Sequence, residues 1–385
     1  MSIKHPVYLD YAAGTPVDPR VWKAMAPFVK DYYANPASLH SLGKQQGEAV
    51  EAARKKIAMV LGAKASEITF TNGSTEGAYI AIQGIAAAFP YARMVTTAIE
   101  HRSVLRNFEQ LESQGRHIGV VPVGERGVVD INQMVAAIDD TTVLVCMQYV
   151  NSEIGTLQPV SQLGKQVELI RRDRQERGIT LPLYFYCDAA QTSLVSLQVS
   201  RLGVDLMTLG ASKLYGPTGS GALYIRTGVD LRRLAGGGTA HVAGAVGLAE
   251  ALEICHKERT AESKHLLHLR NDLLQDLLKV EGVSLNGDAR QRVANNINVR
   301  VAGVPGETLL SYLDAAGFAV ATGSACSAAS EEPSHVLRAV GLSVPEAESS
   351  LRITFGRFTT KSELKAFATA FRKVVAAIRK QTDRV

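Results

Sequence analysis

Short apolar runs that end in polar or glycine-rich turns recur along the first two thirds of the chain. They lie at residues 67–71, 93–99, 117–123, 141–150, 181–187, 204–210 and 221–225. The runs at 141–150 and 181–187 are almost continuously apolar, which is typical of strands covered on both faces. Helix-like segments follow several of these runs. The alternation predicts an α/β domain with a mostly parallel central sheet flanked by helices.

The pattern changes near residue 257. Beyond it the sequence predicts elements that no longer alternate in this way: a helix at 262–280, strands at 283–285 and 295–301, a helix at 306–315, a strand at 350–355, and a final helix. That final helix opens with the capping box Thr360-Lys-Ser-Glu363. A separate helix is expected earlier, at 244–254. We therefore predict a large domain at 17–256, and a smaller α+β domain formed by residues 1–16 and 257–385.

Composition excludes several classes of protein. With 385 residues, 46% hydrophobic and 21% charged, the chain has the composition of a globular protein. The net charge of +5 is spread among acids, so we expect no direct contact with nucleic acid. Four cysteines without a CxxC pair favour a reducing compartment and argue against a zinc site. No apolar run reaches the roughly 20 residues of a membrane span, and no export signal opens the chain, so we expect a cytoplasmic protein.

Four polar side chains follow three of the predicted strands, at 93–99, 181–187 and 204–210. They are His101, Asp188, Gln191 and Lys213. Ligands of open parallel sheets bind at the carboxyl ends of the strands, so these side chains are expected to converge on one crevice. Lys213 taken alone is more simply a surface lysine. A lysine held beside buried apolar residues instead loses hydration, which favours the neutral amine that forms a Schiff base.

A second candidate feature is the small-residue turn Asn72-Gly-Ser74-Thr75, between a predicted strand and an alanine-rich helix. Its backbone N–H groups and two hydroxyls suit a phosphate, although this turn taken alone is more simply explained as a helix cap with nothing bound. A lysine, an aspartate, a histidine and a phosphate site together indicate pyridoxal 5'-phosphate. This cofactor requires a carboxylate that keeps its pyridine nitrogen protonated and a lysine that holds its aldehyde.

Several longer stretches resemble one family. The most specific is Thr322-Gly-Ser-Ala-Cys326-Ser-Ala-Ala-Ser330, and Glu332-Pro-Ser-His-Val-Leu-Arg338 and Leu351-Arg352-Ile-Thr-Phe-Gly follow it. With Tyr8-Leu-Asp-Tyr near the start, they resemble the cysteine desulfurases of the longer-loop group. These are class V aminotransferases with the fold-type I architecture of pyridoxal-phosphate enzymes. The resemblance runs from residue 8 to the last helix.

The resemblance implies a role for each matching residue. Lys213 would bind the cofactor aldehyde, Asp188 the pyridine nitrogen and Gln191 the ring oxygen. His101 would stack on the ring and move protons. The cofactor phosphate would be held by a group of hydroxyls: Ser74, Thr75 and Ser212.

The resemblance also implies how the substrate and its sulfur are handled. Arg352, with Asn35 nearby, would take the substrate carboxylate. Cys326, on a loop at about 321–334, would be the nucleophile. Small residues around it leave that loop mobile, and a thiol with a pKa near ~8.5 is partly thiolate at neutral pH. The buried-hydrophobe interpretation suits Cys146 and Cys187 better.

Three departures from the family pattern occur near the cofactor residues. Gly210-Ala-Ser212 replaces the usual Ser-Gly-His before the lysine, and Ser152 replaces a second asparagine. Serine can still bond the phosphate or the ring oxygen. After the glycine triplet, Gly238 runs directly into Thr239 without the usual intervening segment. We assign Thr239 to the phosphate of the neighbouring subunit's cofactor.

The resemblance implies a homodimeric enzyme. It would convert L-cysteine to L-alanine and leave a persulfide on Cys326, for an iron–sulfur scaffold or a tRNA-thiolation relay protein. No metal is expected. Two alternatives stay open. One is a selenocysteine lyase or another class V lyase or aminotransferase, which would not need Cys326. The other is a catalytically degenerate protein that binds partners, suggested by two of the departures, the altered Gly210-Ala-Ser-Lys213 and the shortened region at Gly238-Thr239.

Overall fold

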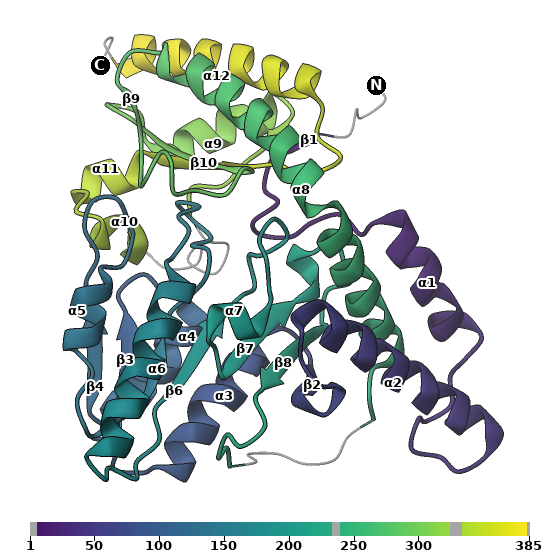
Figure 1. Cartoon of the computed structure of the whole chain (residues 1–385). Helices are drawn as coiled ribbons and strands as arrows, with labels where there is room; N and C mark the ends of the chain where they lie inside the picture. The colour runs from purple at the N-terminus through teal and green to yellow at the C-terminus, as the bar shows by residue number, and fades with distance from the viewer. Residues whose placement is uncertain (1–5, 233–238, 324–332, 383–385) are drawn as a thin grey trace.

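A seven-stranded sheet forms the larger of two units in the computed structural model, which describes residues 6–232, 239–323 and 333–382 (Figure 1). Across the sheet the strands follow the order β2 (Ile68–Thr71), β8 (Gly221–Ile225), β7 (Leu206–Gly210), β6 (Tyr184–Asp188), β5 (Thr142–Cys146), β3 (Arg93–Thr97) and β4 (Ile118–Val121). The strands from β7 to β4 pair in parallel, whereas β8 is antiparallel to both its neighbours. The predicted mostly parallel sheet is confirmed.

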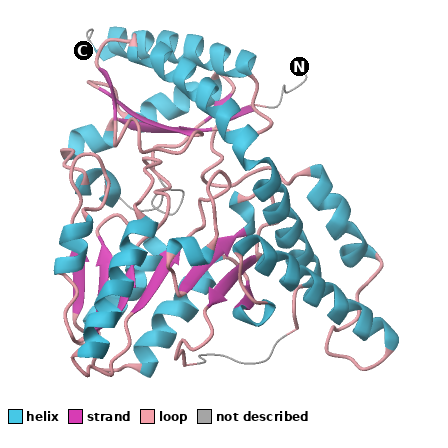
Figure 2. Ribbon diagram, viewed as in Figure 1, coloured by secondary structure: helices cyan, strands magenta, loops and turns pink. Residues whose placement is uncertain are grey.

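Both faces of this sheet are covered (Figure 2). Alternate residues of β6 point to opposite faces, as the two-residue period of a strand requires. Tyr184 and Tyr186 pack in a cluster with α3 (Ser74–Ala88) and α4 (Arg102–Ser113). Phe185 and Cys187 pack on the other face with three helices: α2 (Ser41–Leu61), α6 (Val160–Glu176) and α8 (Val242–Leu278). This double burial explains why the run at 181–187 is apolar throughout.

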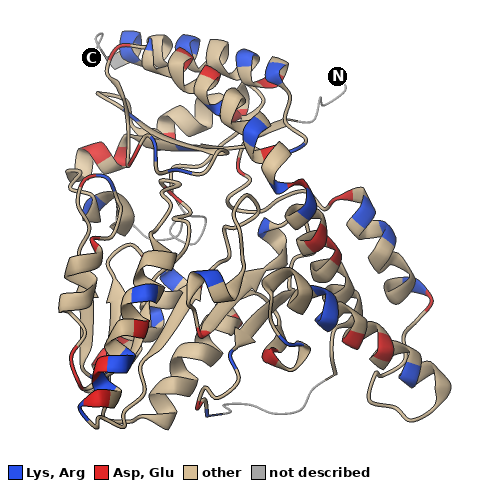
Figure 3. Ribbon diagram, in the orientation of Figure 1, with Lys and Arg blue, Asp and Glu red and all other residues tan. Residues whose placement is uncertain are grey.

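Shorter helices complete the larger unit. They are α1 (Pro19–Lys30), η1 (Ala65–Glu67), α5 (Ile131–Ala136), α7 (Val199–Leu202) and η2 (Ala211–Lys213). On the outer helix α6, basic and acidic residues are interspersed (Figure 3), and Arg172 pairs with Glu168 at 3.3 Å. Such pairs suit a solvated helix face.

The smaller unit has its own hydrophobic cluster, built mainly from residues beyond 266. Its antiparallel sheet has the order β12 (Ser350–Thr354), β10 (Asn296–Val301) and β9 (Val283–Leu285). A parallel pair, β1 (Val7–Tyr8) with β11 (Phe318–Ala319), brings the start of the chain into this unit. Its remaining helices are α9 (Gly306–Ala315), α10 (His335–Ala339), α11 (Val344–Glu348) and α12 (Lys361–Thr382). The predicted capping box is present before α12, because Thr360 and Glu363 bond reciprocally.

The prediction of separate helices at 244–254 and 262–280 is wrong. α8 is one helix of 37 residues that runs from the larger unit into the smaller one (Figure 1). The intervening charged stretch lacks an apolar stripe, but it contains no glycine or proline, and Lys257 pairs with Glu253 one turn away at 2.7 Å. The predicted boundary at 256 therefore falls inside a helix, and the division into two domains stays a prediction.

Among the helices described, none combines the length and the apolarity that crossing a bilayer requires.

Candidate active site

A cavity of about 270 Å³ lies at the carboxyl ends of the parallel strands. Residues from the larger unit form most of its wall, and Arg352 of the smaller unit completes it. Nine residues predicted from the sequence line this one cavity: Ser74, Thr75, His101, Ser152, Asp188, Gln191, Ser212, Lys213 and Arg352. The expected convergence of distant polar residues is therefore present.

Lys213 ends the short helix η2, which continues β7 directly. Its amine donates a hydrogen bond to the carbonyl of Ala13, on the segment that follows β1. The same segment supports the backbone of this turn, since the N–H of Thr15 donates to the carbonyl of Ser212 at 2.8 Å. The amine thus reaches the cavity wall rather than bulk solvent.

Asp188 is the last residue of β6 and is 6% exposed. Its Oδ1 accepts hydrogen bonds from the Ala190 N–H at 3.0 Å and from the Thr208 hydroxyl at 3.4 Å. Burial raises the pKa of Asp188 above its usual value, and the nearby charge of His101 opposes that shift. A cationic group bound in the cavity would stabilise the ionised form.

His101 forms the N-cap of α4. Its Nδ1 accepts a hydrogen bond from the Ser103 N–H at 3.1 Å, and the Ser103 hydroxyl lies 2.7 Å from the same atom. Because the backbone N–H can only donate, Nδ1 of the neutral ring has no proton and Nε2 has one. The ring therefore has a defined tautomer in a loop that lines the cavity.

The first turn of α3 closes one end of the cavity. Gly73 precedes the helix with a φ of 137°, and no side chain caps the helix start. The helix lies close to the sheet, since a Cβ on Gly77 would be 2.7 Å from Cγ2 of Thr208. Its first N–H groups and the Ser74 and Thr75 hydroxyls therefore present a suitable cradle for an anion.

Arg352 is 1% exposed and lies on β12. Its guanidinium pairs with Asp10 at 2.7 Å and donates to the Ser152 carbonyl at 3.2 Å. Its Nε is buried with no hydrogen-bond partner among the described residues. This donor set suits a carboxylate that enters the cavity.

Three predicted residues are not placed in the cavity. Asn35 and Thr239 are exposed, and the Asn35 amide donates to the Thr239 hydroxyl at 3.3 Å. Neither lines the cavity of this chain. Cys326 lies outside the described residues, as does most of the predicted loop at 321–334.

Several residues of the site were not predicted. Gln148 lines the cavity just past β5, where the strand-end rule could have found it. Ala12 and Ala13 contribute only backbone carbonyls, to Gln191 and Lys213 respectively, and so give no side-chain signal. Asp10 was missed although it is a charge beside an apolar run.

Glu100 is a further residue near the site that was not predicted from the sequence. It is fully buried next to His101 and accepts hydrogen bonds from the Thr97 hydroxyl at 2.6 Å and the Gln148 N–H at 2.9 Å. Burial, which outweighs these bonds, raises the pKa of Glu100 to about 7. Within the described residues, no group of three or more His, Cys, Asp or Glu could hold a metal ion.

The fold and the site define a class of protein. The model of the aminotransferase class-V family matches residues 7–238 and 230–367, so the chain belongs to this pyridoxal-phosphate-dependent family. Cysteine desulfurase IscS of Dictyoglomus turgidum is 39% identical over 98% of this chain and 96% of the relative.

Solved structures agree with this assignment. A "NIFS-like protein" has a TM-score of 0.88 and 31% identity, and the match covers 96% of this chain and 99% of that one. The structure titled "SspA in complex with cysteine" has a TM-score of 0.78 and 30% identity, and covers 92% and 100%. Within the class V aminotransferases, the chain belongs to the cysteine desulfurases. The predicted family is thus confirmed.

Proposed function

We propose that this protein takes sulfur from L-cysteine, releases L-alanine and leaves a persulfide on Cys326. The main support for this proposal is that four side chains line one cavity, which the start of α3 closes: Lys213, Asp188, His101 and Arg352. The match to cysteine desulfurases over nearly the whole chain supports the same enzyme class.

The residues present fit pyridoxal 5'-phosphate. Asp188 would bind the pyridine nitrogen, since a cationic ring stabilises a carboxylate whose burial otherwise favours protonation. Gln191 would contact the ring oxygen, and Lys213 would hold the aldehyde. The phosphate would occupy the cradle formed by Ser74, Thr75 and Ser212, with Ser152 as a further hydroxyl of the cavity. When bound, the cofactor supplies an acceptor for the electrons of the substrate's α-carbon.

Arg352 and Lys213 would handle the substrate. The buried guanidinium of Arg352 binds the carboxylate of cysteine, which orients the α-carbon toward Lys213. The Lys213 amine removes the α-proton. His101, which in its neutral form carries the ring proton on Nε2, donates or accepts protons beside the substrate.

Cys326 would complete the transfer. Its thiolate attacks the substrate sulfur and forms a sulfur–sulfur bond as the carbon–sulfur bond breaks. The electron pair of that bond stays on the carbon, which gains a proton to give alanine. A thiol or an acceptor protein, such as an iron–sulfur scaffold or a tRNA-thiolation relay protein, then takes the outer sulfur. We place this reaction in the cytoplasm.

A homodimer would explain the residues outside the cavity. Asn35 and Thr239 lie together on the surface. Thr239 would reach the cofactor phosphate of the neighbouring subunit, and Asn35 would reach the substrate there. The elements on either side of Asn35 carry several large exposed apolar side chains, on α1, α2 and their connection: Trp22, Val29, Tyr33, Leu39 and Leu42. Tyr33 and Leu39 are 86% and 87% exposed, and burying such a patch against a second copy is favourable.

The decisive experiment supplies labelled cysteine to the purified protein and measures alanine together with a persulfide on Cys326 by mass spectrometry. The variant Cys326→Ala should retain the cofactor and lose alanine formation from cysteine. If that variant still releases alanine at the wild-type rate, the alternative of a lyase that does not need this thiol is favoured.

A further inference from the structure

Tyr215, two residues after Lys213, has an unusual backbone conformation. Among the described residues it is the one non-glycine residue with a positive φ, at 60°. This left-handed region brings Cβ too close to the backbone, so it costs energy for a residue with a bulky side chain. Such a conformation persists when surrounding contacts hold it, and these contacts can serve a functional site.

Several hydrogen bonds hold Tyr215 in place. Its N–H donates to the Thr15 hydroxyl at 2.8 Å, and its carbonyl accepts from the Asp18 N–H at 2.9 Å. Its hydroxyl donates to Glu262 at 2.9 Å and accepts from the N–H of Arg357 at 3.1 Å. Burial keeps the pKa of Tyr215 well above its usual value, so this hydroxyl remains a donor.

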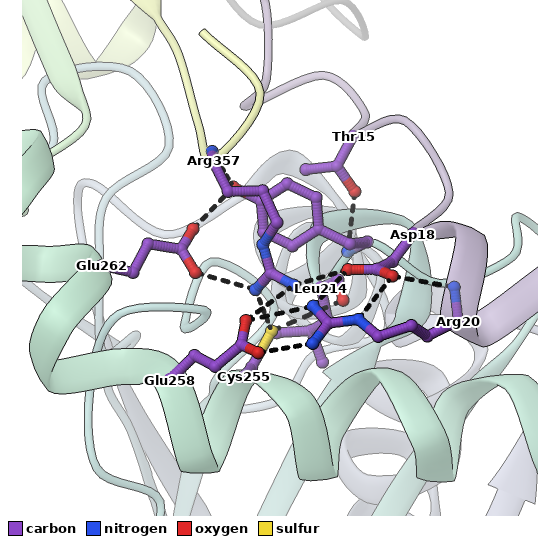
Figure 4. Close-up of polar contacts among 9 residues, drawn as sticks. Thr15, Asp18, Arg20, Leu214, Cys255, Glu258, Glu262 and Arg357 are labelled. Carbon is purple, nitrogen blue, oxygen red and sulfur yellow. Dashed lines mark hydrogen bonds and ion pairs between the residues drawn. The ribbon is translucent and has the colours of Figure 1, made fainter.

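Arg357 lies between the carboxylates of Asp18 and Glu262 (Figure 4). Its guanidinium carbon lies 3.9 Å from the centre of the Tyr215 ring, a cation–π geometry. The same guanidinium donates to Asp18 at 2.8 Å and to Glu262 at 2.8 Å, and it is largely buried. Asp18 caps α1, Glu262 lies in α8, and Arg357 follows β12, so one side chain joins three elements.

The segment from Ala13 to Asp18 carries this arrangement to the active-site lysine. Ala13 accepts the hydrogen bond of the Lys213 amine, and Thr15 bonds the backbone on both sides of Lys213, at Ser212 and Tyr215. At the other end of this segment, the carboxylate of Asp18 accepts a hydrogen bond from the guanidinium of Arg357. Arg357 therefore fixes both the turn that carries Lys213 and the segment that receives its amine.

We propose that Arg357 is a positioning residue for Lys213, acting through Tyr215 and Asp18 from the smaller unit of the fold. This inference rests on the proposed function for its kinetic consequence, because it assumes that Lys213 handles the α-proton. Proton transfer depends steeply on the placement of the reacting amine, so loosening this turn should slow turnover more than it weakens substrate binding.

The test compares Arg357→Gln with Arg20→Gln in the full-length, cofactor-loaded protein. Arg20 is a matched control because it also pairs with Asp18, at 2.8 Å, but its other ion-pair partner among the described residues is Glu258 and not a group that holds Tyr215. For Arg357→Gln we expect about a tenfold lower kcat with KM for cysteine changed less than about twofold. Hydrogen exchange of the backbone amides at 214–216 should accelerate about tenfold. Arg20→Gln should leave all three quantities near the wild-type values.

A folded Arg357→Gln variant with wild-type kcat and wild-type exchange at 214–216 would overturn the proposal. If this variant does not fold, Tyr215→Phe tests the proposal instead. It removes only the hydroxyl that bonds both Glu262 and the backbone N–H of Arg357. It should show the same split between kcat and KM, and wild-type behaviour would overturn the proposal. A wild-type protein that makes no alanine would instead contradict the proposed function, while the exchange comparison would still test the role of Arg357.

Discussion

At the scale of single residues, the cavity contains one buried arginine whose geometry suits a substrate carboxylate. Replacing Arg352 by lysine keeps the charge but removes the planar pair of donors. We expect KM for cysteine to rise about ten- to hundredfold, because a charge-assisted hydrogen bond contributes roughly 1.5–3 kcal/mol. Steady-state kinetics measure this change. Arg300→Lys, on the neighbouring strand β10, is the control, and an unchanged KM in Arg352→Lys would contradict the assigned role.

Glu100 gives a pH prediction. Its pKa in the folded protein is about 7, above the ordinary value of 4.5. The folded state therefore binds the proton more tightly, and stability falls as the pH rises from about 4.5 through 7. The whole effect corresponds to about 3 kcal/mol for this fully buried group. We expect Glu100→Gln to abolish that fall, as measured by denaturant unfolding across this pH range.

The control for this measurement is Glu109→Gln, which removes a carboxylate from the same loop-and-helix region at an exposed position of α4. Its unfolding free energy should follow the wild-type pH dependence. Parallel curves for Glu100→Gln and wild type would show that Glu100 is not the titrating group.

At the scale of elements, the close packing of α3 on β7 fixes the anion cradle. A methyl group on Gly77 would clash with Thr208, whose hydroxyl is already held between Tyr186 and Asp188. Gly77→Ala should therefore destabilise the fold by about 1–3 kcal/mol, and it should weaken cofactor binding as the helix start moves. Thermal unfolding and cofactor titration measure both effects. Gly124→Ala, where a Cβ meets no atom within 4 Å, should change neither quantity.

Helices, strands and turns could be predicted from the sequence where a single local pattern, such as an apolar run or a glycine-rich turn, is sufficient to specify them. The double-sided burial of β5 and β6 is encoded in their continuous apolar runs, and the lysine turn between β7 and β8 is encoded by its glycines. The continuity of α8 was missed because tertiary contacts with two cores, rather than its own periodicity, stabilise it.

Within the site, residues that act through side chains at strand ends could be predicted, as Lys213 and Asp188 illustrate. Ala12 and Ala13 could not, since their contribution is a carbonyl whose direction only the fold determines. Asp10 and Glu100 required knowledge of burial and of long-range partners, which no local pattern contains.

At the scale of the whole molecule, the exposed apolar side chains of α1, α2 and their connection predict a dimer. Leu39→Asp should shift the protein toward monomer in sedimentation experiments, because a charge in a buried interface is costly. Activity should fall with the dimer, since Asn35 and Thr239 would no longer reach a second active site. Tyr91→Asp alters an equally exposed side chain, 93% accessible, on a distant loop and should leave the dimer intact. A Leu39→Asp protein that remains dimeric would exclude this patch.

The continuous helix α8 has one more consequence, for engineering. The first half of α8 packs in one hydrophobic cluster and its second half packs in the other. A truncation at residue 256 would therefore divide the helix and expose apolar side chains in both fragments. Both units of this enzyme contain part of the same helix, so a chimeric or split version must include the whole of α8.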